Sequence, residues 1–148
     1  MVSASLTILD SELLDKLPGK ILASTGMDAL THAIEAYVCK AANPITDGLA
    51  LLAIQMIQEN ILKAVKEHTP EALDAMLAAS TMAGMAFGNS DVASVHSISE
   101  ALGGFYDIPH GVANAMMLAP VSRLSIKGAP EKYAKVAKAL GVDITGMT

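Results

Sequence analysis

The sequence has no tryptophan, few aromatic residues and a single cysteine among its 148 residues. The lone thiol, Cys39, excludes an internal disulfide framework and fits a reducing compartment, so we expect a cytoplasmic protein. Because aromatic residues make up only 3% of the chain, alanine, leucine, isoleucine and nine methionines must fill the core. A core of this kind is typical of closely packed helices.

Basic charge is also scarce, with ten Lys and Arg against 15 Asp and Glu, and the basic residues form no run. This argues against nucleic-acid binding, because neutralising phosphates requires a basic face. No stretch looks apolar enough to span a membrane, and the N-terminus does not resemble a signal peptide. With 52% hydrophobic residues, the chain is long enough to bury the core of one domain.

The spacing of apolar residues and helix breakers predicts an all-α bundle of about six helices. Thr69 and Pro70 are expected to start the third helix, and Gly103-Gly104 to stop the fourth. Residues 105–111 are expected to form a loop, because Pro109 disfavours helix at the residue before it. The predicted helices run from Ser24 or Thr25 to about Ala41, from Thr46 or Asp47 to about Glu67, and over 70–87, 92–104, 110–125 with a kink or end at Pro120, and 130–140.

The two ends of the sequence suggest a piece of a longer protein. A short β-prone segment, Leu6 to Leu9, has no partner strand in view, and the chain stops soon after a predicted helix end at Gly141. We therefore expect residues 1–148 to form one partial, all-helical domain.

An acid and a histidine stand four residues apart in the apolar stretch "GMDALTHAIEAY". On a helix, Asp28 and His32 share one face, which is a good spacing for two ligands of one metal ion. A surface pair, or an acid near the positive end of the helix dipole, explains the same spacing. Glu35 completes an HxxE pattern, but we expect it on a partly different face and in solvent.

The other three histidines are ambiguous when taken singly. His68 lies at a predicted helix end, where it is expected to meet the last carbonyl groups. His96 lies in "SVHSIS" and His110 in "IPHGVANA", where an imidazole is more often structural than a ligand. Together with Asp28 and His32, however, these two make a donor set suited to Zn²⁺ or Fe²⁺. Ligands on separate helices suit the interior of a bundle, although spacing alone leaves open whether they meet.

The segments "STGMDALTHAIEAY" and "VHSISEALGGFYDIPHGVANAMMLAP" together resemble the iron-containing alcohol dehydrogenases. That family has a nucleotide-binding α/β domain followed by an all-α domain, and this chain resembles only the first part of the latter. The resemblance implies that Asp28, His32, His96 and His110 bind the metal, usually Fe²⁺, with Zn²⁺ as a substitute. It also implies hydride transfer between a small alcohol or aldehyde and NAD(P), with the metal as Lewis acid.

Two departures from the family pattern matter. Many members have a second histidine where this chain has Glu100. Glu100 is expected to relay a proton or to act as an outer-shell carboxylate near the metal. The alternative is that its side chain faces water. No glycine-rich phosphate turn is present, so we expect residues 1–148 to lack the coenzyme domain and to be inactive alone. The resemblance places Phe105 on the nicotinamide side, and it implies a homo-oligomer or pairing with a nucleotide-binding domain.

Two other interpretations stay open at this point. The chain is alternatively a non-catalytic metal-binding module that associates with itself or with a partner chain, hiding apolar surface. In the second interpretation, the chain is a metal-free helical scaffold that has kept the ligand residues. Metal content separates the scaffold from the other two interpretations, and hydride transfer separates the dehydrogenase from the metal-binding module.

Overall fold

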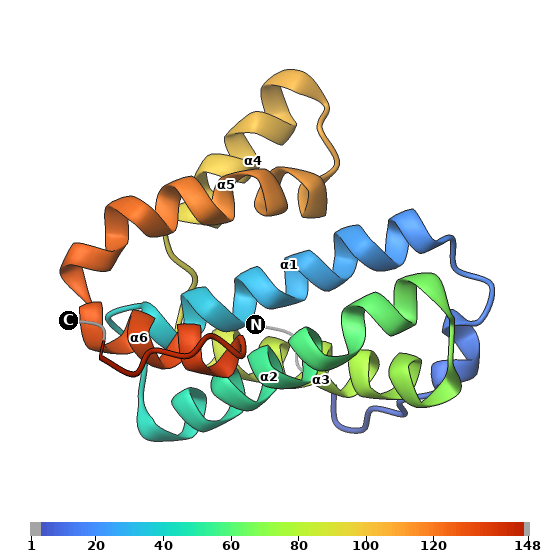
Figure 1. Cartoon of the computed structure of the whole chain (residues 1–148). Helices are drawn as coiled ribbons and strands as arrows, with labels where there is room; N and C mark the ends of the chain where they lie inside the picture. The colour runs from blue at the N-terminus through green and yellow to red at the C-terminus, as the bar shows by residue number, and fades with distance from the viewer. Residues whose placement is uncertain (1–3, 147–148) are drawn as a thin grey trace.

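The computed structural model describes residues 4–146, and these residues form helices and no strand (Figure 1). The predicted all-α bundle of six helices is therefore confirmed. The β-prone segment from Leu6 to Leu9 is not a strand, and its side chains are exposed. The elements are η1 (Ser11–Leu14), α1 (Gly19–Val38), α2 (Pro44–Lys66), α3 (Pro70–Gly88), α4 (Ser94–Tyr106), α5 (His110–Ser125), η2 (Ile126–Gly128) and α6 (Pro130–Ala139).

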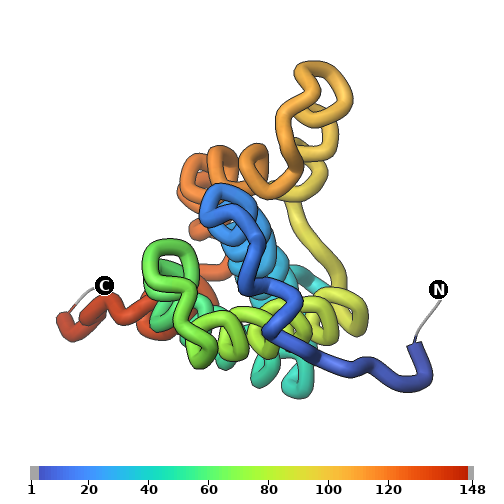
Figure 2. Tube along the Cα trace, turned by 90° about the vertical axis from the view of Figure 1, so that its right-hand side faces the viewer, coloured from blue at the N-terminus to red at the C-terminus, as the bar shows by residue number. Residues whose placement is uncertain are grey.

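Helix α1 is the central element of the described chain and contacts each of the other five α-helices. Figures 1 and 2 show α2, α3 and α6 on one side of it and the α4–α5 hairpin on the other. A helix that meets neighbours on both sides must be apolar over most of its circumference. Apart from Thr31 and Glu35, the buried residues of α1 are apolar or glycine: Leu22, Gly26, Ala29, Leu30, Ala33, Ile34, Ala36 and Tyr37.

The main core lies between α1, α2 and α3, where Tyr37, Ile54, Ile57 and Leu73 have almost no exposed surface. By length and composition alone α2 is apolar enough to cross a membrane, contrary to the expectation that no stretch is. In the structure α2 instead packs on α1, α3 and α6 through one face. Only 28% of its most apolar stretch is buried, and Ile45, Leu52 and Leu62 on the remaining surface are exposed.

The start of α1 differs from the sequence-based prediction. The helix begins at Gly19, before the expected caps Ser24 and Thr25, and it ends somewhat early, at Val38. Both hydroxyls donate to the carbonyl oxygen of Ile21, at 3.1 and 2.8 Å, from inside the helix. Serine and threonine hydroxyls inside a helix can donate hydrogen bonds to a carbonyl oxygen of the preceding turn. Their presence therefore does not by itself indicate the start of a helix.

The starts of α2 and α3 are set by side-chain caps. Asn43 accepts hydrogen bonds from the backbone N–H groups of Ile45 and Thr46, so α2 begins at Pro44, two residues before the earlier of the two predicted starts. For α3 the prediction is confirmed, since the Thr69 hydroxyl accepts from a first-turn N–H and Pro70 follows it.

The α4–α5 hairpin is tighter than predicted. Helix α4 continues through Gly103-Gly104 to Tyr106, so Phe105 is helical and not part of a loop. A glycine inside a helix costs only about 1 kcal/mol, so the glycine pair does not by itself end the helix. The helix ends at Tyr106, and the next residue, Asp107, has a left-handed backbone with a φ of 53°. Only residues 107–109 connect α4 to α5.

Helix α5 begins at His110 and continues through Pro120, where an end or kink was expected, to Ser125. Its second residue, Gly111, lies against the backbone of α1. A Cβ atom at Gly111 would overlap the carbonyl oxygen of Ser24 and come within 2.7 Å of its carbonyl carbon. The absence of a side chain at Gly111 therefore sets how closely α5 approaches α1. This close approach lies next to His110, the first residue of α5.

Candidate metal centre

Four side chains from three helices converge where the hairpin crosses α1. Asp28 and His32 extend from one face of α1, His96 from the first turn of α4 and His110 from the first residue of α5. One donor atom from each lies within 4.8 Å of every other. The structure thus brings together all four residues that the sequence singled out; we call them the quartet.

The distances within the quartet suit a small divalent cation. Donor atoms at about 2.1 Å from a tetrahedral centre are about 3.4 Å apart. In the structure the Nε2 atoms of His32 and His96 are 3.2 Å apart, and Nε2 of His110 is 3.4 Å from Oδ1 of Asp28. Asp28 oxygens lie 3.7 Å from Nε2 of both His32 and His96. Three imidazoles and one carboxylate are also the donor types preferred by Zn²⁺ and Fe²⁺.

The quartet is buried at one end and open at the other. The side chain of His96 is only 4% exposed, whereas that of His110 is 45% exposed. Asp28 and His32 are intermediate. The quartet is therefore open to solvent on the side of His110.

Glu35 was expected in solvent, and this prediction is wrong. Its carboxylate is 3% exposed and accepts a 2.7 Å hydrogen bond from Nδ1 of His96. It also accepts from the backbone N–H groups of Val95 and His96, at 2.7 and 3.2 Å. The error arose because the start of α4 lies against this part of α1, which the sequence does not reveal.

Asn114 was missed by the sequence analysis. Its buried side-chain Nδ2 donates to Oδ1 of Asp28 at 2.6 Å and lies 3.1 Å from Nε2 of His110. Asn114 follows His110 by four residues on α5, the same spacing that pointed to Asp28 and His32. Applying that spacing to every candidate ligand would have found it.

His32 is held by ring stacking. Its ring lies 4.2 Å from that of Phe87 and 4.0 Å from that of His96, measured between ring centroids. Its Nδ1 atom is buried and has no hydrogen-bond partner in the described part of the chain. The orientation of His32 therefore depends on its neighbours' rings.

The site concentrates negative charge around one imidazole. Burial lowers the pKa of His96, but hydrogen bonds with Asp28 and Glu35 outweigh it and raise that pKa to about 9. Burial and the nearby charge of His96 lower the pKa of His32 to about 4. Burial raises the pKa of each carboxyl group, yet their hydrogen bonds, first of all with His96, leave both pKa values below the usual range. A protonated His96 thus balances one of the two carboxylates, Asp28 and Glu35, whereas a divalent cation would balance both.

The remaining residues that the sequence singled out lie apart from the quartet. Glu100 and Phe105 are exposed on α4, and Phe105 is 85% exposed. Within residues 4–146 neither makes a hydrogen bond or ring contact with the quartet. The His68 imidazole bonds with the carbonyl oxygen of Leu17 before α1, while its backbone N–H donates to the carbonyl oxygen of Lys63 in the last turn of α2.

Comparison with known proteins gives consistent matches along the chain. Residues 22–148 match the model of the Fe-containing alcohol dehydrogenase family, C-terminal. The 1,3-propanediol dehydrogenase of Klebsiella pneumoniae is 46% identical over 145 residues, which cover 97% of this chain and 38% of that protein. The NAD-dependent methanol dehydrogenase of Bacillus methanolicus is 40% identical over 99% of this chain and 39% of its own length.

A solved structure of a 1,3-propanediol oxidoreductase matches with a TM-score of 0.92 and 46% identity. The match covers 94% of this chain and 37% of that one. The sequence thus spans well under half of the relatives that it matches, and the fold agrees with the corresponding part of a solved member.

Proposed function

Because the chain belongs to the iron-containing alcohol dehydrogenase family, we propose that it supplies the metal-binding side of an NAD(P)-dependent alcohol dehydrogenase site. The observation that supports this most is the convergence of Asp28, His32, His96 and His110 at distances that suit one cation. Fe²⁺ is the proposed metal, with Zn²⁺ as a substitute. When bound, such a cation polarises a carbonyl oxygen and favours the alkoxide form of an alcohol.

The residues of this chain have distinct parts in the proposal. The quartet binds the cation, and Asn114 holds the Asp28 carboxylate by its 2.6 Å hydrogen bond. The exposed edge at His110 admits a small alcohol or aldehyde. On the outer side of α4, Glu100 is proposed as a proton relay and Phe105 as a contact for the nicotinamide ring.

The coenzyme requires residues outside this set. Residues 4–146 contain no strand, and so they lack the strand–turn–helix unit that binds a dinucleotide pyrophosphate. We therefore propose that residues 1–148 act as one partial metal-binding domain. NAD(P) is then held by a nucleotide-binding domain that belongs either to the same, longer chain or to a partner chain. We propose that the assembly is a cytoplasmic oligomer. The isolated chain is expected to bind metal without transferring hydride.

A non-catalytic metal-binding module is the second candidate. It is favoured by the fact that the quartet and its outer contacts, Glu35 and Asn114, all lie within residues 28–114. Hydride transfer after addition of the coenzyme-binding part distinguishes a dehydrogenase from such a module.

The ligand assignment is tested by titrating the metal-free chain with Zn²⁺ in a calorimeter. We expect one equivalent to bind to the unchanged protein and none to the double variant Asp28→Ala/His110→Ala. His68→Gln is the matched control, because it removes an imidazole that lies outside the quartet. Binding of one equivalent by the double variant would contradict the assignment, and NADH- or NADPH-dependent reduction of propanal by the isolated chain would contradict its inactivity.

A further inference from the structure

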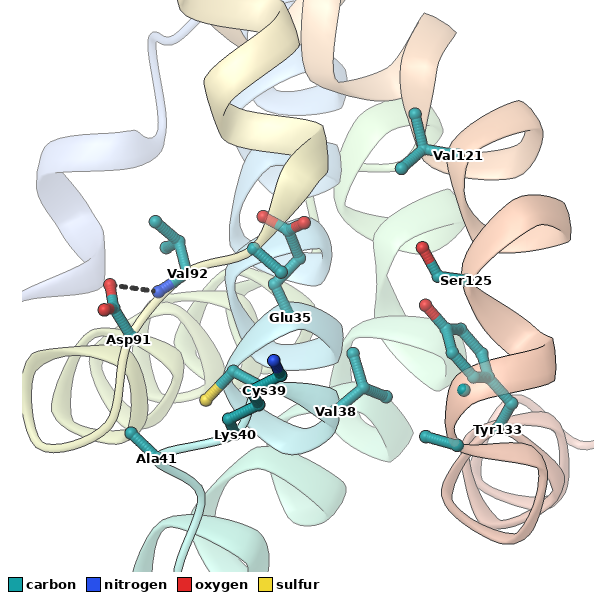
Figure 3. A pocket seen from close by; sticks show the side chains of 13 residues that line it. Glu35, Val38, Cys39, Lys40, Ala41, Asp91, Val92, Val121, Ser125 and Tyr133 are labelled. Atoms are coloured by element: carbon teal, nitrogen blue, oxygen red, sulfur yellow. Dashed lines mark hydrogen bonds between the residues drawn. The ribbon is translucent and has the colours of Figure 1, made fainter.

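Glu35 is a buried carboxylate that no step of the proposed chemistry uses. It lies on α1 three residues after His32, at the edge of a cleft of about 480 Å³ that none of the quartet side chains lines. Figure 3 shows this carboxylate turned away from Cys39 and Lys40, toward the first turn of α4. Glu35 thus lines this cleft and also hydrogen-bonds with His96 of the quartet.

The first set of contacts closes the start of α4. The residue before this helix is Ala93, which has no side-chain oxygen and makes no cap. The second and third N–H groups of the helix, those of Val95 and His96, instead donate to the two oxygens of Glu35. These are the N–H groups that a serine or aspartate cap normally satisfies. A carboxylate 60 residues away in the sequence thus replaces the local cap.

The second contact fixes the His96 ring. A carboxylate has no proton to donate, so Nδ1 of His96 carries the hydrogen of their 2.7 Å bond. In the neutral ring this leaves the lone pair on Nε2, which faces Asp28 and His32 at 3.7 and 3.2 Å. A carboxylate on the outer nitrogen is a common way to orient a metal-binding histidine.

We propose that Glu35 is a positioning residue whose carboxylate both caps α4 and orients His96 toward the metal. One side chain thereby couples the docking of α4 on α1 to the geometry of the quartet. The effect extends to His32, because its ring stacks on that of His96. This inference rests on the proposed metal site for its second half only, since the capping of α4 exists without metal.

The central test is the variant Glu35→Gln, with Glu59→Gln as control, because Glu59 is an exposed residue of α2 outside the site. We expect Glu35→Gln to weaken Zn²⁺ binding by about 10–100-fold, the range for loss of an outer-shell partner. We expect the amides of Val95 and His96 to exchange hydrogen roughly 2–30-fold faster in the metal-free variant, as when a helix cap is lost. The slowly exchanging Nδ1–H resonance of His96 should disappear. Glu59→Gln should change none of these readouts.

The double variant Glu35→Gln/Ala93→Ser separates the two roles. A serine at residue 93 restores a local cap, so amide exchange in α4 should return toward its original rate while Zn²⁺ affinity stays low. Glu35→Asp, which keeps the charge on a shorter side chain, replaces Glu35→Gln if that variant does not fold. We expect it to weaken Zn²⁺ binding relative to the unchanged protein, because the shorter side chain withdraws the carboxylate from Nδ1 of His96.

The outcomes distinguish the two claims. Unchanged Zn²⁺ affinity, α4 exchange and His96 resonance in a folded Glu35→Gln variant would overturn the inference. If the unchanged protein binds no Zn²⁺, the proposed function fails, but exchange and the His96 resonance in the metal-free protein still decide whether Glu35 positions α4 and the ring.

Discussion

The contact between Gly111 and α1 gives a sharp prediction, because it sets the position of His110. In Gly111→Ala the new Cβ atom would lie within 2.7 Å of the Ser24 carbonyl carbon, against an ordinary contact of at least 3.4 Å. The start of α5 must therefore move from α1 by about 0.7 Å or more. Metal–ligand distances in a working site vary by only about 0.2 Å from their usual values. This shift therefore moves Nε2 of His110 too far from Asp28 for both to bind the same cation.

The magnitudes predict an unequal effect on stability and on binding. Overpacking costs about 1–3 kcal/mol, and the better helix propensity of alanine returns about 1 kcal/mol. The free energy of unfolding should thus fall modestly, by about 2 kcal/mol or less. Zn²⁺ affinity should fall by about 100-fold or more, since a direct ligand moves and outer-shell losses already reach 10–100-fold.

The assay combines urea unfolding of the metal-free chain with Zn²⁺ titration. Gly104→Ala is the matched control, because a Cβ at that helical glycine meets nothing within 4 Å. It should raise stability by about 0.5–1 kcal/mol and leave Zn²⁺ binding unchanged. A Gly111→Ala variant with the original Zn²⁺ affinity would refute the reasoning that the α1–α5 approach sets the site.

Two further predictions concern protons and the core. The pKa of His96 is raised to about 9 in the metal-free protein, so Zn²⁺ must displace one proton from it. Zn²⁺ affinity should therefore rise about tenfold per pH unit from pH 7 to pH 9 and level off above; a flat profile in calorimetry would count against it. Leu73→Ala should lower the free energy of unfolding by about 2–5 kcal/mol in urea, because Leu73 is fully buried. Its metal stoichiometry should stay at one, and loss of metal from the folded variant would link the core to the site.

Helix content was predictable from the sequence because the breakers are few and the apolar residues recur at helical spacing. Boundaries were less predictable where a residue had two uses. Ser24 and Thr25 resemble caps but bond backward inside α1. Gly103-Gly104 resembles a stop, yet α4 continues to Tyr106, because a glycine inside a helix costs only about 1 kcal/mol and does not by itself end the helix.

The quartet was predictable as a set because its motifs resemble those of one family. The contacts around it were not, because they depend on how the helices pack. Glu35 reaches its partners only because α4 starts beside α1. The spacing of residues in the HxxE pattern does not indicate which helix packs there. Asn114 is the exception, since its four-residue spacing from His110 is readable from the sequence.

The central claim is that Asp28, His32, His96 and His110 hold one divalent cation. Elemental mass spectrometry of the purified chain tests it most directly, first without added metal and then after anaerobic addition of Fe²⁺ and removal of the excess. The account predicts about one equivalent of Fe or Zn per chain. Absence of bound metal in both preparations would contradict it and favour a helical scaffold that has kept the residues without the site.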